Sequence, residues 1–185
     1  MIVGNVYNMP PQPPVEENTT WFDAGAVSLG VEYRSLTPEQ LVDTFKDNPK
    51  YLAELLEKSP EGGFTDEGVS LHVKAIADGH EYVRFDVFDG DPHYHYVHNT
   101  APGEDPINNV VVYDTVAHGD MLDWAIGRLR TRLPDMLTQA GGAEVAAQVD
   151  PKLTAPVIDK IEKLAAKALA DSRALASAQV ASATT

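Results

Sequence analysis

The sequence predicts an α+β fold, built on an antiparallel sheet of about five strands with helices on one face. Four strand-like segments follow one another at residues 69–76, 80–88, 93–98 and 109–116, which is typical of a four-stranded antiparallel meander. An initial strand-like segment and two helical segments precede the meander, and a helix and an alanine-rich C-terminal helix follow it. This order of elements is typical of the α+β class.

The composition bounds the class of function. The chain has 185 residues, enough for one domain with tails, and its 28 acidic and 14 basic residues give a net charge of −14. This excess of negative charge argues against binding to nucleic acid or to an anionic membrane surface, since both need basic patches. The chain has no cysteine, which excludes disulfides, zinc–thiolate sites and thiol catalysis. Without an apolar run of about 20 residues or the features of a signal peptide, we expect a soluble cytoplasmic protein.

The composition also divides the chain into three parts. Residues 1–20 are predicted to form an extended arm, because four of the six residues 9–14 are prolines. Residues 21–142 are expected to form the α+β domain, and residues 143–185 a linker and an alanine-rich C-terminal helix with a frayed tail. The apolar residues Ile2, Val3, Val6 and Tyr7 favour an arm that straps over a partner or a neighbouring subunit, although a solvated lead-in stays open.

Capping residues predict where the helices begin. Thr37, followed by Pro38 and Gln40, has the pattern of a capping box, and Asn48 before Pro49 predicts a second helix that ends near residues 59–63. Asp120 predicts the start of a later helix that stops at residues 141–142, with Pro134 expected to bend or interrupt it.

The C-terminal helix is expected to run from Thr154 to about Ala178. Its apolar seam is thin, because Ile158, Ile161 and Leu175 are joined by small residues. Such a helix buries little alone, so we expect it to pack on the domain or on another chain.

The register of two hairpins decides which side chains of the meander meet. A three-residue loop at 77–79 unites the apolar rows of the first two strands, because it places Val73 opposite Val83. A four-residue loop at 89–92 then pairs Phe88 with His93 and places Asp86 opposite His95. A one-residue slip in this second hairpin would instead turn His93 and His95 toward the core.

With these registers, the sheet has one apolar and one polar face. The apolar face carries Val69, Leu71, Val73, Val83, Phe85, Val87, Tyr94 and Tyr96. The opposite face, which we call the histidine face, carries Ser70, His72, Lys74, Tyr82, Arg84, Asp86, Phe88, His93, His95 and Val97. Because the helices should cover the apolar face, the histidine face is expected to be open.

Metal binding is one interpretation of this face. The metal ligands would be His93, His95, His72 and Asp86, since two imidazoles and a carboxylate form the ligand set of many divalent transition-metal sites. The His93-Tyr94-His95 segment resembles the first metal motif of the cupin family over these few residues. No acidic ligand follows at the cupin spacing and no second histidine motif lies downstream, so the chain is not assigned to that family.

Two other interpretations of the histidine face stay open. It is either a hydrogen-bonded polar surface without a ligand, or a binding face for a small anion or a partner chain. Its binding residues would then be Arg84, His72, Tyr82, His93 and His95, which combine positive charge with an aromatic anchor.

The function favoured by the sequence is a non-catalytic accessory or assembly protein. It would form a homo-oligomer or a complex through the N-terminal arm and the C-terminal helix, and would use the histidine face for a ligand or partner. The alternative is a metal-binding protein or metal-dependent enzyme that uses the His/Asp cluster. The sequence does not decide whether the protein is an enzyme.

Overall fold

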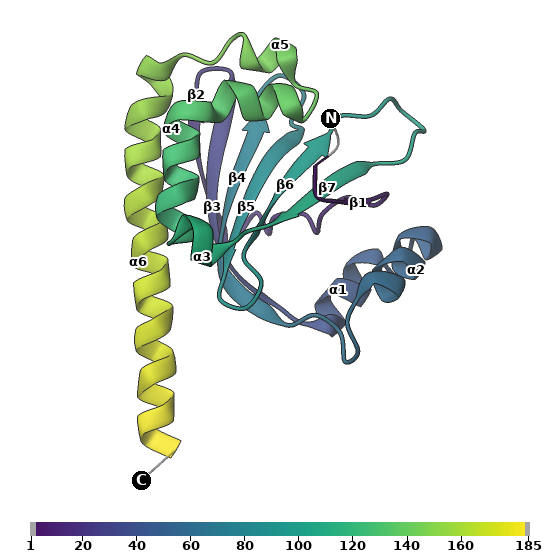
Figure 1. Ribbon diagram of the computed structural model, residues 1–185, viewed down its shortest axis with the longest axis vertical. Coiled ribbons are helices and arrows are strands. Elements are labelled where there is room, and N and C mark those ends of the chain that lie inside the picture. The colour runs from purple at the N-terminus through teal and green to yellow at the C-terminus, as the bar shows by residue number, and fades with distance from the viewer. Residues whose placement is uncertain (1–2, 184–185) are drawn as a thin grey trace.

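The computed structural model describes residues 3–183, so residues 1–2 of the predicted arm and 184–185 of the predicted tail lie outside the described part. The chain folds as predicted into the α+β class, but the expected number of about five strands is wrong. The sheet has seven antiparallel strands in the order β1-β7-β6-β5-β4-β3-β2 (Figure 1). The strands are β1 (Asn5–Tyr7), β2 (Thr19–Ala24), β3 (Val27–Leu36), β4 (Asp66–Ala75), β5 (Glu81–Phe88), β6 (His93–His98) and β7 (Ile107–Val112).

Six helices complete the described chain. They are α1 (Pro38–Phe45), α2 (Pro49–Lys58), α3 (Thr115–His118), α4 (Met121–Gln139), α5 (Ala143–Ala146) and α6 (Pro151–Ala183). The predicted caps are confirmed, since the side chains of Thr37, Asn48 and Asp120 accept hydrogen bonds from backbone N–H groups in the first turns of α1, α2 and α4. Among the helices of residues 3–183, none is long and apolar enough to cross a membrane.

The hydrophobic core lies between the apolar face of the sheet and the helices α4 and α6, which lie together on that face (Figure 1). Leu71 and Phe85 of the sheet are fully buried against this layer, as are Leu137 of α4 and Ile161 of α6. Each such side chain contributes about 1.5–3 kcal/mol by leaving water. The first half of α6 therefore packs on its own domain, and α4 runs through Pro134 without a break.

The first hairpin has the predicted pairing in its core. Val73 lies opposite Val83, and Ser70 lies opposite Asp86. The turn is longer than the predicted three residues, because the backbone N–H of Ala75 donates to the carbonyl oxygen of His80. A β-bulge lies next to this turn, at Val73/Lys74. Because of the bulge, the side chain of Tyr82 does not follow the alternation between the two faces along β5.

The predicted register of the second hairpin is wrong by two residues. Asp86 lies opposite His93 rather than His95. The carboxylate of Asp66 explains the longer connection, because it accepts hydrogen bonds from the backbone N–H groups of Gly90 (2.9 Å) and Asp91 (2.7 Å). These bonds hold the chain beside β4 after β5 ends, so the last pair between β5 and β6 is Asp86 with His93 rather than Phe88 with His93. A two-residue shift returns every side chain to the face on which it was predicted.

The expectation that the histidine face is open is wrong. The proline-rich arm crosses this face, and His72 and Arg84 are each only 1% exposed. Arg84 Nη1 donates to the backbone carbonyl of Gln12 at 2.8 Å, and the N–H of Val15 donates to Glu32 Oε1 at 3.2 Å. Buried guanidinium groups need acceptors, and a proline-rich segment offers carbonyls while bringing few N–H groups that need partners of their own.

Gly68 of β4 lies very close to the backbone of β5. A Cβ added to this glycine would lie 2.2 Å from the carbonyl oxygen of Val87. We expect Gly68→Ala to lower the free energy of unfolding by about 1–3 kcal/mol through this overlap. Gly127→Ala is the control, since nothing lies near its Cβ and alanine favours the helix by up to about 1 kcal/mol. Urea unfolding of both variants checks the prediction, which is contradicted if Gly68→Ala is as stable as the wild type.

Candidate metal centre

Asp86, His93 and His95 form a compact cluster on the histidine face. One side-chain ligand atom of each lies within 4.8 Å of the others. Nε2 of His95 lies 2.9 Å from Asp86 Oδ2, and Nε2 of His93 lies 3.3 Å from the same oxygen. All three residues are buried. Three of the four predicted metal ligands are therefore brought together.

The pairing of β5 with β6 positions this cluster. Asp86 faces His93 directly across the two strands, and His95 follows two residues along β6 on the same face. The centroids of the two imidazole rings lie 4.9 Å apart. The arrangement needs only local strand pairing, so it follows from His-x-His on one strand and a carboxylate on its neighbour.

Each group of the cluster is also held from its outer side. His93 Nδ1 lies 2.6 Å from the backbone carbonyl of Asp91, and His95 Nδ1 lies 2.8 Å from the carboxamide oxygen of Asn108. These acceptors take the proton of Nδ1, which directs Nε2 of both rings toward Asp86. The hydroxyl of Ser70 donates to Asp86 Oδ1 at 2.5 Å, leaving Oδ2 for the histidines.

The three groups differ in their protonation. Burial raises the pKa of the Asp86 carboxyl, but the contacts with His93 and His95 outweigh it and hold that pKa well below its usual value. Burial also lowers the pKa of His93, yet the contact with Asp86 outweighs it and raises that pKa. For His95, burial and the nearby positive charges of His93 and Arg84 prevail and lower the pKa. His93 therefore holds a proton more readily than His95.

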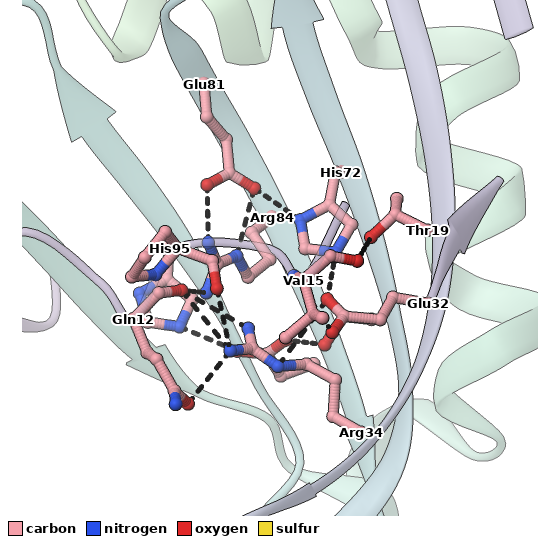
Figure 2. Close-up of polar contacts among 12 residues, drawn as sticks. Gln12, Val15, Thr19, Glu32, Arg34, His72, Glu81, Arg84 and His95 are labelled. Carbon is pink, nitrogen blue, oxygen red and sulfur yellow. Dashed lines mark hydrogen bonds and ion pairs between the residues drawn. The ribbon is translucent and has the colours of Figure 1, made fainter. Parts of the chain in front are cut away.

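His72 does not join the cluster, although it was predicted as a fourth ligand. Its Nδ1 lies 2.6 Å from Glu81 Oε1 and its Nε2 lies 3.2 Å from Glu32 Oε2 (Figure 2). Arg84 stands between His72 and His95 in the same row of the sheet, since it is paired with both. Arg84 therefore separates His72 from the cluster, and His72 contacts two glutamates instead of Asp86.

Two buried arginines lie beside the cluster. Arg84 forms two hydrogen bonds with the Glu81 carboxylate, at 2.9 and 2.5 Å, and although burial lowers its pKa, this carboxylate prevails and raises it. Arg34 has no such partner: Nη2 donates to Gln12 Oε1 at 2.9 Å, and Nε lies 3.7 Å from Glu32 (Figure 2). Burial and the charge of Arg84 lower the pKa of Arg34.

Tyr82 does not lie on the histidine face, so its predicted place there is wrong. The β-bulge turns its ring into the core, where it lies against Gly142, and its hydroxyl donates to Asp78 at 3.1 Å. The sequence showed no sign of this bulge.

A cavity of about 180 Å³ adjoins the metal cluster. It lies between the histidine face, the arm and the α1–α2 pair. Its polar wall includes Arg34, Arg84, Asp86, His93, His95 and Asn108, and its apolar wall includes Met9, Leu41, Phe45, Leu55, Phe64 and Phe88. Sequence reasoning missed Gln12, Arg34 and Asn108. Only Arg34 had a visible signal, since Glu32 and Arg34 alternate with apolar residues in a strand-like segment.

Comparison with known families was informative for the domain but not for its chemistry. The profile of a domain of unknown function, DUF7700, matches residues 21–165. The chain belongs to the DUF7700 family. The matched region of this DUF7700 protein contains Asp86, His93 and His95. Gln12 and the rest of the arm lie outside it. Neither the curated proteins nor the solved structures contain a match.

The pairing of Glu81 with Arg84 predicts acid sensitivity. Burial alone would raise the pKa of Glu81, but Arg84 and His72 lower it far below the ordinary value of 4.5. A lowered pKa in the folded state contributes stability above pH 4.5 that is lost as the pH falls below it. We expect Glu81→Gln to lower the free energy of unfolding by about 3–5 kcal/mol at neutral pH, because Arg84 is left without its carboxylate. The variant should also lose less of its remaining stability than the wild type as the pH falls below 4.5.

Chemical unfolding between pH 2 and 7 measures both effects. Asp135→Asn is the control, since Asp135 is 70% exposed in its pair with Arg132 and such pairs contribute little. An acid limb in Glu81→Gln as steep as that of the wild type would contradict the assignment.

Proposed function

We propose that this protein binds a divalent first-row transition metal through Asp86, His93 and His95, and uses it for chemistry on a small molecule in the adjoining cavity. The observation that carries the proposal is the orientation of the imidazoles. Both Nδ1 atoms face oxygen acceptors, so both Nε2 atoms converge on one carboxylate oxygen.

This orientation leaves a lone pair of each neutral ring facing a negative oxygen. Such an arrangement repels unless a cation lies between the groups. A proton serves for His93, whose pKa is raised, but burial and nearby charges lower the pKa of His95. A metal ion satisfies both rings and the carboxylate together. Metal-bound histidines characteristically donate their second N–H to a carbonyl or carboxylate group, as both rings do here.

The distances agree with a shared ion. Ligand atoms that lie about 2.1 Å from one metal are separated from each other by about 3.0–3.4 Å in octahedral or tetrahedral geometry. The two Nε2 atoms lie 2.9 and 3.3 Å from Asp86 Oδ2. Both distances between imidazole and carboxylate therefore suit ligands of one ion.

The ligand count and the position of the cluster favour catalysis over a structural role. Structural zinc sites are closed by four protein ligands, whereas catalytic sites keep a position for water or substrate. Two histidines and one carboxylate form the set that leaves positions open in non-haem iron enzymes. All three residues line the cavity, so the open positions of the metal would face it. The metal would polarise a bound oxygen or lower the pKa of a bound water.

Metal analysis of purified variants tests this function. We expect wild-type protein dialysed against Co²⁺ or Zn²⁺ to retain about one ion per chain, and His93→Ala and His95→Ala to retain none. Asn108→Ala should weaken metal binding by about 10- to 100-fold, because it removes the acceptor that orients His95. His118→Ala is the control, since His118 is exposed and stacks near Trp124. The proposal fails if His93→Ala and His95→Ala bind metal as the wild type does.

A second candidate function is assembly through the C-terminal part of α6. This end of the helix extends beyond the sheet, and Leu175 on it is 66% exposed (Figure 1). The arm offers less support for assembly, because Gln12, Pro13 and Val15 are engaged by the buried charged groups of the sheet. We propose that α6 contributes to a homo-oligomer or to a complex with a partner protein.

Light scattering on a sizing column tests the homo-oligomer. We expect a discrete multimer for the wild type and a smaller mass for Leu175→Glu, which places a charge on the exposed seam. Val116→Glu is the matched control, because Val116 is an exposed apolar residue outside α6. A monomeric wild type would rule out the homo-oligomer.

A further inference from the structure

The cavity beside the metal cluster has the size of a small organic molecule. Its volume of about 180 Å³ is close to the ~150 Å³ of an engineered protein cavity that binds one benzene ring. One side of the cavity is apolar, with Leu41 and Phe45 of α1, Leu55 of α2 and Phe88 of β5 among its lining residues. The opposite side is polar, so a ligand that fits it has an apolar body and one polar end.

Arg34 supplies the polar end with an incompletely paired charge. The residue is 4% exposed, and its nearest carboxylate, Glu32, lies 3.7 Å away. Its other partners are neutral oxygens of the arm: the Gln12 backbone carbonyl at 3.4 Å, the Pro13 carbonyl at 3.3 Å and the Gln12 side-chain oxygen at 2.9 Å. A buried guanidinium is expected to have a close anionic partner.

Arg84 provides the comparison within the same site. It carries the same charge and is also buried, yet it forms two close hydrogen bonds with Glu81. Glu32, in contrast, divides its oxygens among Val15 N–H, His72 and Arg34. Of the two adjacent guanidinium groups, Arg84 is therefore hydrogen-bonded to a carboxylate of the chain, whereas Arg34 can still accept a bound anion as its close partner.

Gln12 marks where that anion would bind. Its side-chain oxygen makes the shortest contact with Arg34, while its Nε2 donates to Thr44 of α1 at 3.2 Å in an exposed position. A carboxylate oxygen can replace this amide oxygen and gain a charge-assisted hydrogen bond. The displaced side chain forms no part of the sheet, so the exchange leaves the fold intact.

We propose that this cavity binds a small monocarboxylate, with its carboxylate on Arg34 and an apolar body of about six to eight carbons against Leu41, Phe45 and Phe88. A monocarboxylate is favoured over a phosphate dianion, because the neighbouring carboxylates of Glu32, Glu81 and Asp86 repel a second negative charge. This ligand site goes beyond the metal centre and stands on Arg34 whether or not a metal is bound.

Calorimetric titration of the full-length protein with benzoate and benzamide tests the proposal, because the two probes differ mainly in charge. We expect benzoate to bind at least about tenfold more tightly than benzamide. Arg34→Gln should remove this preference. Arg130→Gln should keep it, since Arg130 pairs with Asp159 and Glu162 on the helical side of the molecule. Each titration is run once with chelator and once with Zn²⁺.

Three results of the comparison between benzoate and benzamide would overturn the assignment to Arg34. They are no binding of benzoate, equal affinity for benzoate and benzamide, or an unchanged benzoate preference in Arg34→Gln. If Arg34→Gln does not fold, the comparison of the two probes on the wild type still decides. Benzoate binding that requires Zn²⁺ and persists in Arg34→Gln would place the carboxylate on the metal and likewise overturn the assignment. Benzoate that binds with chelator supports the proposal even if the metal centre fails its own test.

Discussion

The burial of charged groups on one face of the sheet is the constraint on which the remaining structure depends. Arg34, Arg84, Glu32 and Asp86 all lie on strands of the sheet and are nearly inaccessible to water. An unpaired charge in such a place costs several kcal/mol, so each needs partners from another part of the chain. The proline-rich arm supplies many of them through the Gln12 and Pro13 carbonyls and the Val15 N–H. The arm is therefore part of the folded domain in energetic terms, although the DUF7700 match begins after it.

The two faces of the sheet are stabilised in different ways. The apolar face packs against α4 and α6 through non-directional contacts, which tolerate some variation in side-chain shape. The histidine face depends on directional bonds, so its geometry must be set by the backbone. Asp66 contributes to this by holding the Gly90–Asp91 segment, whose Asp91 carbonyl in turn orients His93. A carboxylate outside the metal cluster thus determines the direction of one of its ligands.

The sequence allowed the composition of each face to be predicted but not all of the contacts across it. The alternation of apolar and polar residues assigns faces correctly even with a register error of two, which is why His93, His95 and Asp86 were placed together. The error itself came from the Asp66 bonds, which join residues far apart in the chain and leave no local pattern. Tyr82 was misplaced because a bulge breaks the period of two on which the assignment rests.

The missing strands and the course of the arm have a similar explanation. β1 has only three residues, and β2 carries Trp21 and Phe22 side by side, so neither shows a clear alternation. The arm was expected to reach a partner because its apolar residues had no visible place in the domain. Val6 and Tyr7 instead form part of β1, which pairs with β7. The later part of the arm finds its partners only after the sheet brings Glu32, Arg34 and Arg84 together. Local patterns thus predict elements, whereas charges that meet across strands are visible only in the assembled sheet.

The formal charges of the site connect the metal and the ligand. With the histidines counted as neutral, the carboxylates of Glu32, Glu81 and Asp86 face only two guanidinium groups, Arg34 and Arg84. A divalent cation on the cluster would turn this single negative excess into a single positive one. A monocarboxylate on Arg34 would then bring the buried site to neutrality. Each of the two events would therefore favour the other through charge alone, because like excess charges in a low-dielectric interior are costly.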